Sequence, residues 1–318
     1  MKVVSIDAFH LKYPFEPSCA CIGYFDGIHK GHKELLLNCI EQADKNQLKK
    51  VCITFDPDPW VIFKNEKQKH LSTLSDKIQI LSSYGFDEVY ILQFSKEFAS
   101  LSIESFHHLL KEMNIKILIC GFDFKYGQFN SGNVDTLKKQ NDFKVIVIDS
   151  VNFSNLKIST SRIEPLILKG ELYQANVLLD YIYSISGYIE HGFKRGTNVL
   201  KIPTANLNVD QEYILPKTGV YAGMVLLENQ FYKAMINIGT NPTFNNQHLT
   251  IEAHILDFDE DIYGQKIRFF FYDRIRDEMK FHSIDELKNQ LLRDIQYVDQ
   301  LNFDECLLKN TRNIFFKN

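Results

Sequence analysis

The sequence predicts an α/β protein in two parts. The first is a parallel β-sheet covered by helices, and the second is a small antiparallel β-barrel with terminal helices. Up to about residue 150, apolar runs alternate with helical patterns, as they do in sheets built from βαβ units. Beyond residue 181, short runs rich in Tyr, Phe, Ile and Val are separated by turn signals such as "GTNP" and "DEDIYG", as they are in small barrels.

In the first half, the expected strands are continuous apolar runs, which is typical of parallel strands buried on both faces. They are residues 18–25, 49–55, 86–94, 115–122 and 143–151. The segments between them show helical spacing of apolar residues. The expected helices are residues 32–46, 74–85 and 102–114.

Residues 161–180 have a helical pattern interrupted by a proline and a glycine, which predicts two short helices connecting the domains. In the second half we expect strands in four segments: residues 183–192, 219–239, 249–258 and 265–276. A serine cap followed by helical spacing predicts a helix over residues 283–302. The expected division is therefore 1–160, a helical connection 161–180, and 181–318.

Composition narrows the class of protein. A chain of 318 residues suggests two domains, and a formal net charge of −4 argues against a general nucleic-acid binder. The six cysteines form no C-x-x-C pair and lie mostly in apolar runs, which is typical of reduced thiols in a cytoplasmic protein. No apolar run approaches the ~20 residues needed to span a bilayer. We therefore expect small-molecule partners, with neither nucleic acid nor membrane.

The stretch "GYFDGIHKGHKELL" places two histidines where a strand turns into a helix. Ligands of open α/β sheets bind at the carboxyl ends of strands, and a helix start offers free N–H groups. His29 and His32 are three residues apart, so both can lie on one face of the first turn. Gly27 and Gly31 allow close approach to the backbone. This pattern indicates a phosphate site.

Two other interpretations fit the same residues. Histidines at a helix start are often surface polar residues without a ligand. A zinc site fits less well, because no third ligand lies near them in the sequence.

Several motifs, in order, resemble those of bacterial bifunctional riboflavin kinase/FMN adenylyltransferases, also called FAD synthetases. "GYFDGIHKGH" resembles the H-x-G-H signature of nucleotidyltransferases, and "TFDPDP", "CGFDFKYG" and "ISTSRIE" resemble later motifs of the same domain. In the second half, "IPTANL", "NIGTNPTF" and "IEAHILDF…DIYG" resemble riboflavin kinase motifs. The resemblance covers nearly the whole chain. It implies a nucleotidyltransferase-type first domain that adenylylates FMN to FAD and a second domain that phosphorylates riboflavin, with ATP and Mg²⁺.

For the first domain, the resemblance implies that His29 and His32 hold the ATP phosphates while charge builds in the transition state. The full set of implied ATP-binding residues is Gly23, Phe25, Asp26, Gly27, His29, His32, Ser159, Thr160, Ser161 and Arg162. The serines and the threonine suit a plain helix cap equally well. The implied flavin-binding residues are Phe55, Pro57, Asp123 and Phe124. A loop with core aromatic residues explains those four residues equally well.

For the second domain, the resemblance implies that Glu252 is the catalytic base, since a neutral ribityl hydroxyl favours a carboxylate. A polar residue inside an apolar strand otherwise needs a structural hydrogen bond. Thr204 and Asn206 would place oxygens on Mg²⁺, and Lys201 would contact ATP. Arg276 would support the flavin or phosphate end, or else form a surface ion pair.

Two departures from the family pattern stand out. The chain reads "GFKRGTNVLKIPTAN", with Lys194 and Lys201 where glycines are expected. Lysine removes the backbone freedom of glycine and adds charge. Glu164 stands where the adenylyltransferase motif ends in arginine, and a carboxylate there would repel a triphosphate. Three interpretations follow: an enzyme with both activities, an enzyme with one of them, and a flavin-binding regulator without catalysis.

Overall fold

The computed structural model describes residues 1–64, 68–190, 203–209, 212–241 and 248–316. It divides the chain into two compact units, Met1–Thr160 and Ser161–Asn318. Within these described ranges, no helix is both long enough and apolar enough to cross a membrane.

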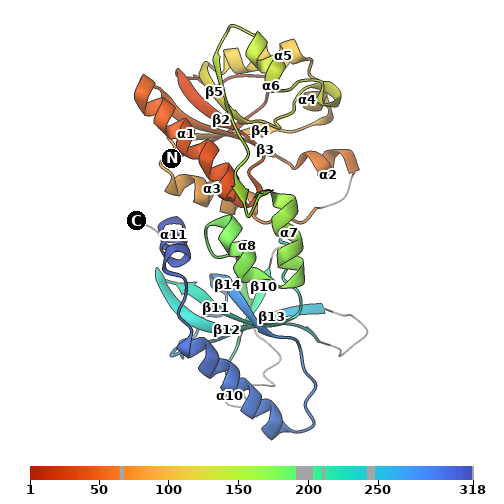
Figure 1. Ribbon diagram of the computed structural model, residues 1–318, viewed down its shortest axis with the longest axis vertical. Helices are drawn as coiled ribbons and strands as arrows, with labels where there is room; N and C mark the ends of the chain where they lie inside the picture. Colours follow the sequence, from red (N-terminus) through yellow and green to blue (C-terminus); the bar gives the residue numbers. More distant parts are fainter. Residues whose placement is uncertain (65–67, 191–202, 210–211, 242–247, 317–318) are drawn as a thin grey trace. The chain divides into compact units, whose positions relative to one another are not determined.

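The first unit contains a six-stranded sheet in which every neighbouring pair is parallel (Figure 1). The order is β1-β4-β3-β2-β5-β6. The strands are β1 (Lys2–Ile6), β2 (Ser18–Ile22), β3 (Lys49–Asp56), β4 (Glu88–Gln93), β5 (Ile115–Gly121) and β6 (Lys144–Ile148). The parallel sheet confirms the prediction. β1 is absent from the predicted strands, because this edge strand is mostly exposed and lacks a buried apolar run.

Helices cover both faces of this sheet. In Figure 1, α1 and α3 lie on one face, and α4, α5 and α6 lie on the other. The helices are α1 (Lys30–Asn46), α2 (Pro59–Lys64), α3 (Leu74–Ser83), α4 (Lys96–Ala99), α5 (Ile103–Glu112) and α6 (Val134–Lys139). Side-chain caps define several of their starts; Thr73, for example, forms a reciprocal capping box with Asp76 at the start of α3.

The order of the strands fixes where a ligand can bind. The chain runs from β2 to β3 on one side and later returns to β5 on the other side of β2. The crevice outside the carboxyl ends of β2 and β5 is therefore the switch point at which open α/β sheets bind ligands. The loop that carries the two histidines begins there. A hairpin of β7 (Asn152–Phe153) and β8 (Leu156–Lys157) follows β6.

The cysteines agree with the expectation of reduced thiols. All six are free. Five are buried in the first unit, and only Cys306 is exposed. Cys39 of α1 packs against β2, with its Sγ 3.9 Å from the Sγ of Cys19.

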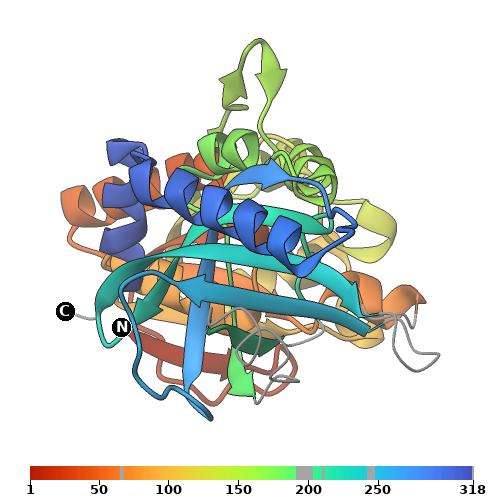
Figure 2. The ribbon, with the colours of Figure 1, turned by 90° about the horizontal axis from the view of Figure 1, so that it is seen from below.

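The second unit is a closed six-stranded barrel in the order β10-β13-β12-β11-β14-β9, with antiparallel neighbours (Figure 2). The strands are β9 (Ser184–Glu190), β10 (Ala205–Val209), β11 (Gly219–Leu227), β12 (Gln230–Asn241), β13 (His248–Ile255) and β14 (Lys266–Arg276). The antiparallel barrel confirms the prediction. In Figure 2 the long blue helix α10 (Ile284–Gln300) lies across the barrel strands, and its Val298 is buried with Val220 and Met235.

Two short helices precede the barrel, as the sequence predicts. They are α7 (Thr160–Lys169) and α8 (Leu172–Leu179). The helical conformation is interrupted between them at Gly170, where φ is +81°. Pro165 lies inside α7. Asn176 of α8 is fully buried and donates to the backbone oxygens of Phe271 and Tyr272 in β14, each at 3.0 Å. α8 is thus bonded to the barrel wall. The last helix is α11 (Glu305–Phe315).

Candidate active sites

The loop between β2 and α1 has a strained backbone. It contains a short 3-10 turn, η1 (Asp26–Ile28), and left-handed φ values of 56° at Phe25, 69° at Gly27 and 37° at Ile28. Phe25 and Ile28 adopt this conformation without being glycine, and each is only 1% exposed. Such residues cost on the order of 1–3 kcal/mol each and persist where the surroundings hold them. Residues in this conformation cluster at functional sites.

The two predicted histidines lie together at the start of α1. His29 is the N-cap residue, and its Nδ1 accepts a hydrogen bond from the backbone N–H of His32 at 3.3 Å. The imidazole rings are stacked, with centroids 3.8 Å apart. A side chain at Gly31 would come within 3.1 Å of the His29 ring. A side chain at position 31 would therefore be crowded against the His29 ring.

Burial leaves both histidines uncharged near neutral pH. It lowers the pKa of His29 to about 4, and it lowers the pKa of His32 well below the usual range, with a further contribution from His29. The Nδ1 of His32 is buried and has no hydrogen-bond partner. Each neutral ring carries one N–H, which it can donate to an anion. The Nδ1 of His32 is the ring nitrogen that still lacks a hydrogen-bond partner.

Asp26 anchors the histidine loop to the segment that precedes α3. Its carboxylate is 6% exposed and accepts from the backbone N–H groups of Leu71, at 3.2 Å, and Ser72, at 3.0 Å. The Ser72 hydroxyl in turn accepts from the backbone N–H of Gly27 at 2.8 Å. These bonds hold the strained turn, and the Asp26 side chain faces the protein interior.

The predicted segment around residue 159 reaches the same loop. The hydroxyl of Thr160 donates to the backbone oxygen of Asp26 at 3.3 Å. The Ile158 carbonyl lies 3.5 Å from the position that a Cβ of Gly31 would occupy. Ser159 lies between these two residues. Ser161 and Arg162 are the first residues of the second unit, within α7.

The predicted flavin residues divide into two pairs. Phe55 and Phe124 are half-buried and pack against the core of the sheet; the Phe55 ring lies 6.1 Å from that of Phe94. Pro57 and Asp123 are exposed. Asp123 forms an ion pair with Lys157 of β8. Packing explains the two phenylalanines without a ligand, and the two exposed residues are accessible to one.

Sequence reasoning missed a buried polar cluster below the histidine loop, which consists of Tyr24, Asp58, His70 and Lys77. Lys77 is 3% exposed and donates to the Tyr24 backbone oxygen at 3.3 Å. Burial lowers its pKa, and the carboxylates of Asp26, Asp56 and Asp58 oppose that shift. The available signal was a lysine at an apolar-facing position of the predicted helix 74–85.

The second candidate site lies on the wall of the barrel. Glu252 of β13 is paired across the strands with Asn206 of β10 and with Asn237 of β12. Directly paired residues point to the same face of a sheet, so these three side chains adjoin. The hydroxyl of Thr204 donates to Oε2 of Glu252 at 3.5 Å. Burial raises the pKa of Glu252, which makes it a stronger proton acceptor.

Arg276 forms an ion pair. Its Nε and Nη2 contact Oδ2 of Asp294 at 2.9 and 2.7 Å. Asp294 belongs to α10, is 2% exposed and also accepts from Gln290 at 2.9 Å. The pair is thus more buried than the surface pair that the sequence suggested.

Some predictions fall outside the described residues, among them those for Lys194 and Lys201. Within the described ranges, no group of three or more His, Cys, Asp or Glu side chains could hold a metal ion.

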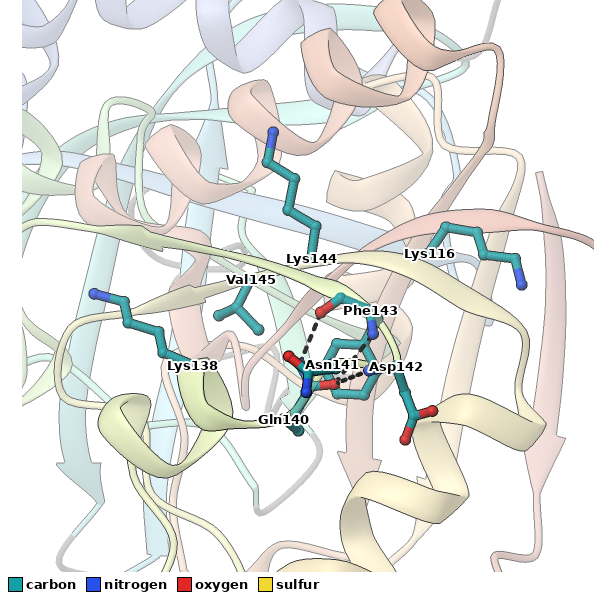
Figure 3. Close-up of a pocket in the computed structure, with 8 residues that line it drawn as sticks. All are labelled: Lys116, Lys138, Gln140, Asn141, Asp142, Phe143, Lys144 and Val145. Atoms are coloured by element: carbon teal, nitrogen blue, oxygen red, sulfur yellow. Dashed lines mark hydrogen bonds between the residues drawn. The ribbon is translucent and has the colours of Figure 1, made fainter.

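A hollow of about 460 Å³ in the first unit is lined by none of the predicted site residues. Figure 3 shows the residues that line it: Lys116, Lys138, Gln140, Asn141, Asp142, Phe143, Lys144 and Val145. Its lysines point away from one another in Figure 3, and Lys116 and Lys144 stand at the amino ends of β5 and β6. It therefore lacks convergent groups and lies at the opposite sheet edge from the switch point.

Comparisons with known proteins match both halves of the chain. Residues 13–162 match the FAD synthetase family, and residues 179–302 match the riboflavin kinase family. A bifunctional riboflavin kinase/FMN adenylyltransferase of Listeria monocytogenes is 36% identical over 281 residues, covering 86% of this chain and 89% of that protein. The Bacillus subtilis protein of the same name is 35% identical over 306 residues, covering 93% and 96%.

A solved structure is also similar. It is a Streptococcus pneumoniae protein whose title calls it a macrolide-efflux protein. It is 34% identical, covers 95% of this chain and 100% of its own, and superposes with a TM-score of 0.87. The similarity shows a common fold over both units.

Proposed function

Since the chain belongs to the family of bifunctional riboflavin kinase/FMN adenylyltransferases, we propose that its first unit converts FMN to FAD at the histidine loop and its second unit phosphorylates riboflavin at the wall of Glu252. The family activity uses ATP and Mg²⁺, with riboflavin, FMN and FAD as substrates and products.

In adenylyl transfer, the FMN phosphate attacks the α-phosphate of ATP and pyrophosphate leaves. The nucleophile is already an anion, so the site needs alignment and charge stabilisation more than a base. We assign this role to His29 and His32. Two buried, neutral imidazoles with one unsatisfied nitrogen fit a phosphate that supplies negative charge and hydrogen-bond acceptors.

The remaining proposed contacts surround this pair. Gly23, Phe25, Asp26 and Gly27 shape the loop for the triphosphate, with the Asp26 carboxylate acting as an anchor. Ser159 and Thr160 end the first unit next to the histidine loop and would contact the phosphates; Ser161 and Arg162, the further proposed contacts, follow them directly in the sequence. Phe55, Pro57, Asp123 and Phe124 would form the flavin side, and the exposure of Pro57 and Asp123 leaves them accessible.

In riboflavin phosphorylation, the nucleophile is a neutral hydroxyl that must lose its proton. Glu252 would accept that proton, and its raised pKa suits the task. Thr204 and Asn206 supply the hydroxyl and amide oxygens that Mg²⁺ prefers, next to a carboxylate. When bound there, Mg²⁺ would neutralise phosphate charge. Arg276, oriented by Asp294, would serve the flavin or phosphate end, and Lys201 the ATP end.

We further propose that 1–160 and 181–318 carry the two activities, joined by 161–180. We also place the chain in the cytoplasm, a proposal supported by its six unpaired thiols.

The stacked pair of neutral histidines at the switch point is the observation that carries this proposal. The test is to incubate the chain with ATP and Mg²⁺ and either riboflavin or FMN, and to separate the products by chromatography. FMN followed by FAD is expected from riboflavin, and FAD from FMN. If only one substrate reacts, a single activity remains. Unchanged, bound flavin would indicate a regulator.

A further inference from the structure

His70 lies between two buried carboxylates that belong to different loops. Its Nε2 is 3.2 Å from Oδ2 of Asp58, and its Nδ1 is 4.0 Å from Oδ2 of Asp26. Asp26 and Asp58 are each 6% exposed, and the His70 side chain is 13% exposed. Water therefore screens these contacts little, and each carboxylate depends on protein partners.

The two carboxylates anchor the loops on either side of the proposed reaction centre. Asp26 holds the histidine loop through Leu71 and Ser72, which directly follow His70. Asp58 lies in "TFDPDP", between the proposed flavin residues and α2, and accepts from the backbone N–H of Trp60 at 2.7 Å. Residues 70–72 thus contact Asp26, in the proposed phosphate-binding loop, and Asp58, next to the proposed flavin-binding residues.

His70 also lies within a cluster of buried charges. Two carboxylates are buried there beside one buried ammonium, that of Lys77. Lys77 stacks over the Tyr24 ring at 3.9 Å and donates a hydrogen bond to the Tyr24 backbone oxygen at 3.3 Å. The Tyr24 ring lies 5.7 Å from His70. The His70–Asp58 contact is within hydrogen-bond range, and the His70–Asp26 contact is at ion-pair distance.

We propose that His70 is a positioning residue for adenylyl transfer: by bridging Asp26 and Asp58, it holds the flavin loop in register with the histidine loop. This inference rests on the proposed function, because it assumes that the two loops carry FMN and ATP. Correct spacing of an attacking phosphate and its target is worth more to the rate than to the binding of either substrate. His70 therefore acts on kcat through the loops, without touching substrate.

The test measures FAD formation from FMN in the full chain, with riboflavin phosphorylation as an internal control. His70→Gln retains one donor and loses the bridge, so kcat for FAD formation should fall about 10- to 100-fold, with a much smaller change in both KM values. His70→Arg restores a planar fork that can reach two carboxylates, so it should recover most of the rate. Riboflavin phosphorylation should stay unchanged in both variants.

Two further variants sharpen the test. His108→Gln removes another histidine–carboxylate pair of the same unit, with Glu112 at 3.5 Å, but that pair is exposed, so its kcat should stay native. Asp58→Asn should lower kcat as His70→Gln does, and the double variant should lose little more, because both changes break one bridge.

Several results would overturn the proposal. They are a native kcat in His70→Gln, a His70→Arg rate no better than that of His70→Gln, and KM values that rise as much as kcat falls. If His70→Gln does not fold, His70→Arg alone decides the matter. Failure of the proposed function looks different: a variant with His29→Asn and His32→Asn would then still make FAD.

Discussion

The histidine loop and the barrel wall, to which we assign the two phosphate transfers, are built in opposite ways. The loop after β2 has left-handed residues, a buried anchor at Asp26 and two uncharged histidines. The wall holds Glu252 on regular strands, opposite Asn206 and Asn237. The difference follows the nucleophile. An anionic phosphate needs hydrogen-bond donors held in a costly conformation, whereas a neutral hydroxyl needs one carboxylate on a rigid strand.

The largest expected effect comes from the histidines. His29→Asn together with His32→Asn should reduce FAD formation from FMN by at least about 100-fold, because the loss of transition-state donors costs roughly 3 kcal/mol or more. Asparagine keeps an N-cap for α1. Riboflavin phosphorylation should stay near native, and His10→Ala, at an exposed position, should leave both rates unchanged. Equal loss of both activities would contradict the separation of the two sites.

The second prediction tests the barrel wall. Glu252→Gln should lower riboflavin phosphorylation by about 10²- to 10⁴-fold, since it removes a general base while keeping the size of the side chain. FAD formation from FMN should stay native. The comparison requires initial rates for both reactions in one preparation. A normal kinase rate would mean that Glu252 is not the general base and that its side chain has only a structural hydrogen bond to Thr204.

The third prediction uses the uncharged state of His29. The folded pKa of about 4 lies below the ordinary value of 6.5, so between these limits the unfolded chain binds a proton that the folded chain does not. Stability should therefore fall as the pH drops from 6.5 to 4 and should not depend on His29 above 6.5. The shifted pKa of His29 accounts for a loss of about 3 kcal/mol in the free energy of unfolding over this pH range.

The measurement is hydrogen exchange in urea for peptides from β2 and β5, which belong to the first unit. Between pH 6.5 and pH 4, the free energy of unfolding of the His29→Asn variant should fall by about 3 kcal/mol less than that of the native chain. Identical pH profiles would mean that His29 is not desolvated in the folded protein.

The smallest expected effect concerns α8. Asn176→Ala removes two donated bonds and the acceptor of the Tyr183 N–H at 2.7 Å. Unsatisfied buried groups cost about 1–3 kcal/mol. The temperature at which half of the kinase activity is lost should therefore fall by roughly 5–10 °C. The exposed Gln174→Ala on the same helix is the matched control. FAD formation should lose nothing, unless the units unfold together.

The fold was largely predictable because its signals are local. Buried strands such as β2 and β5 read as continuous apolar runs, and Ser283 marks the start of α10. The edge strand β1 and the two-residue strands β7 and β8 carry too few apolar residues to be recognised. β10 begins within "PTAN", which on its own is a turn signal, so the sequence did not predict a strand there.

The candidate sites were predictable only where a motif is contiguous. His29 and His32 stand in one motif and stack in space. His70 and Asp58 come from a segment with no helical or strand pattern, and only tertiary packing brings them to Asp26. The charge state of the histidines was also not predictable, because desolvation depends on which groups cover the rings.

The buried thiols have a consequence for oxidative damage. Thiolate is the form of cysteine that oxidants attack. Burial raises the pKa of Cys120 to about 12 and that of Cys21 well above its usual range, so these sulfur atoms remain protonated as well as covered. Peroxide or a maleimide should therefore react first with Cys306. The buried thiols of the first unit should therefore stay reduced after Cys306 has reacted.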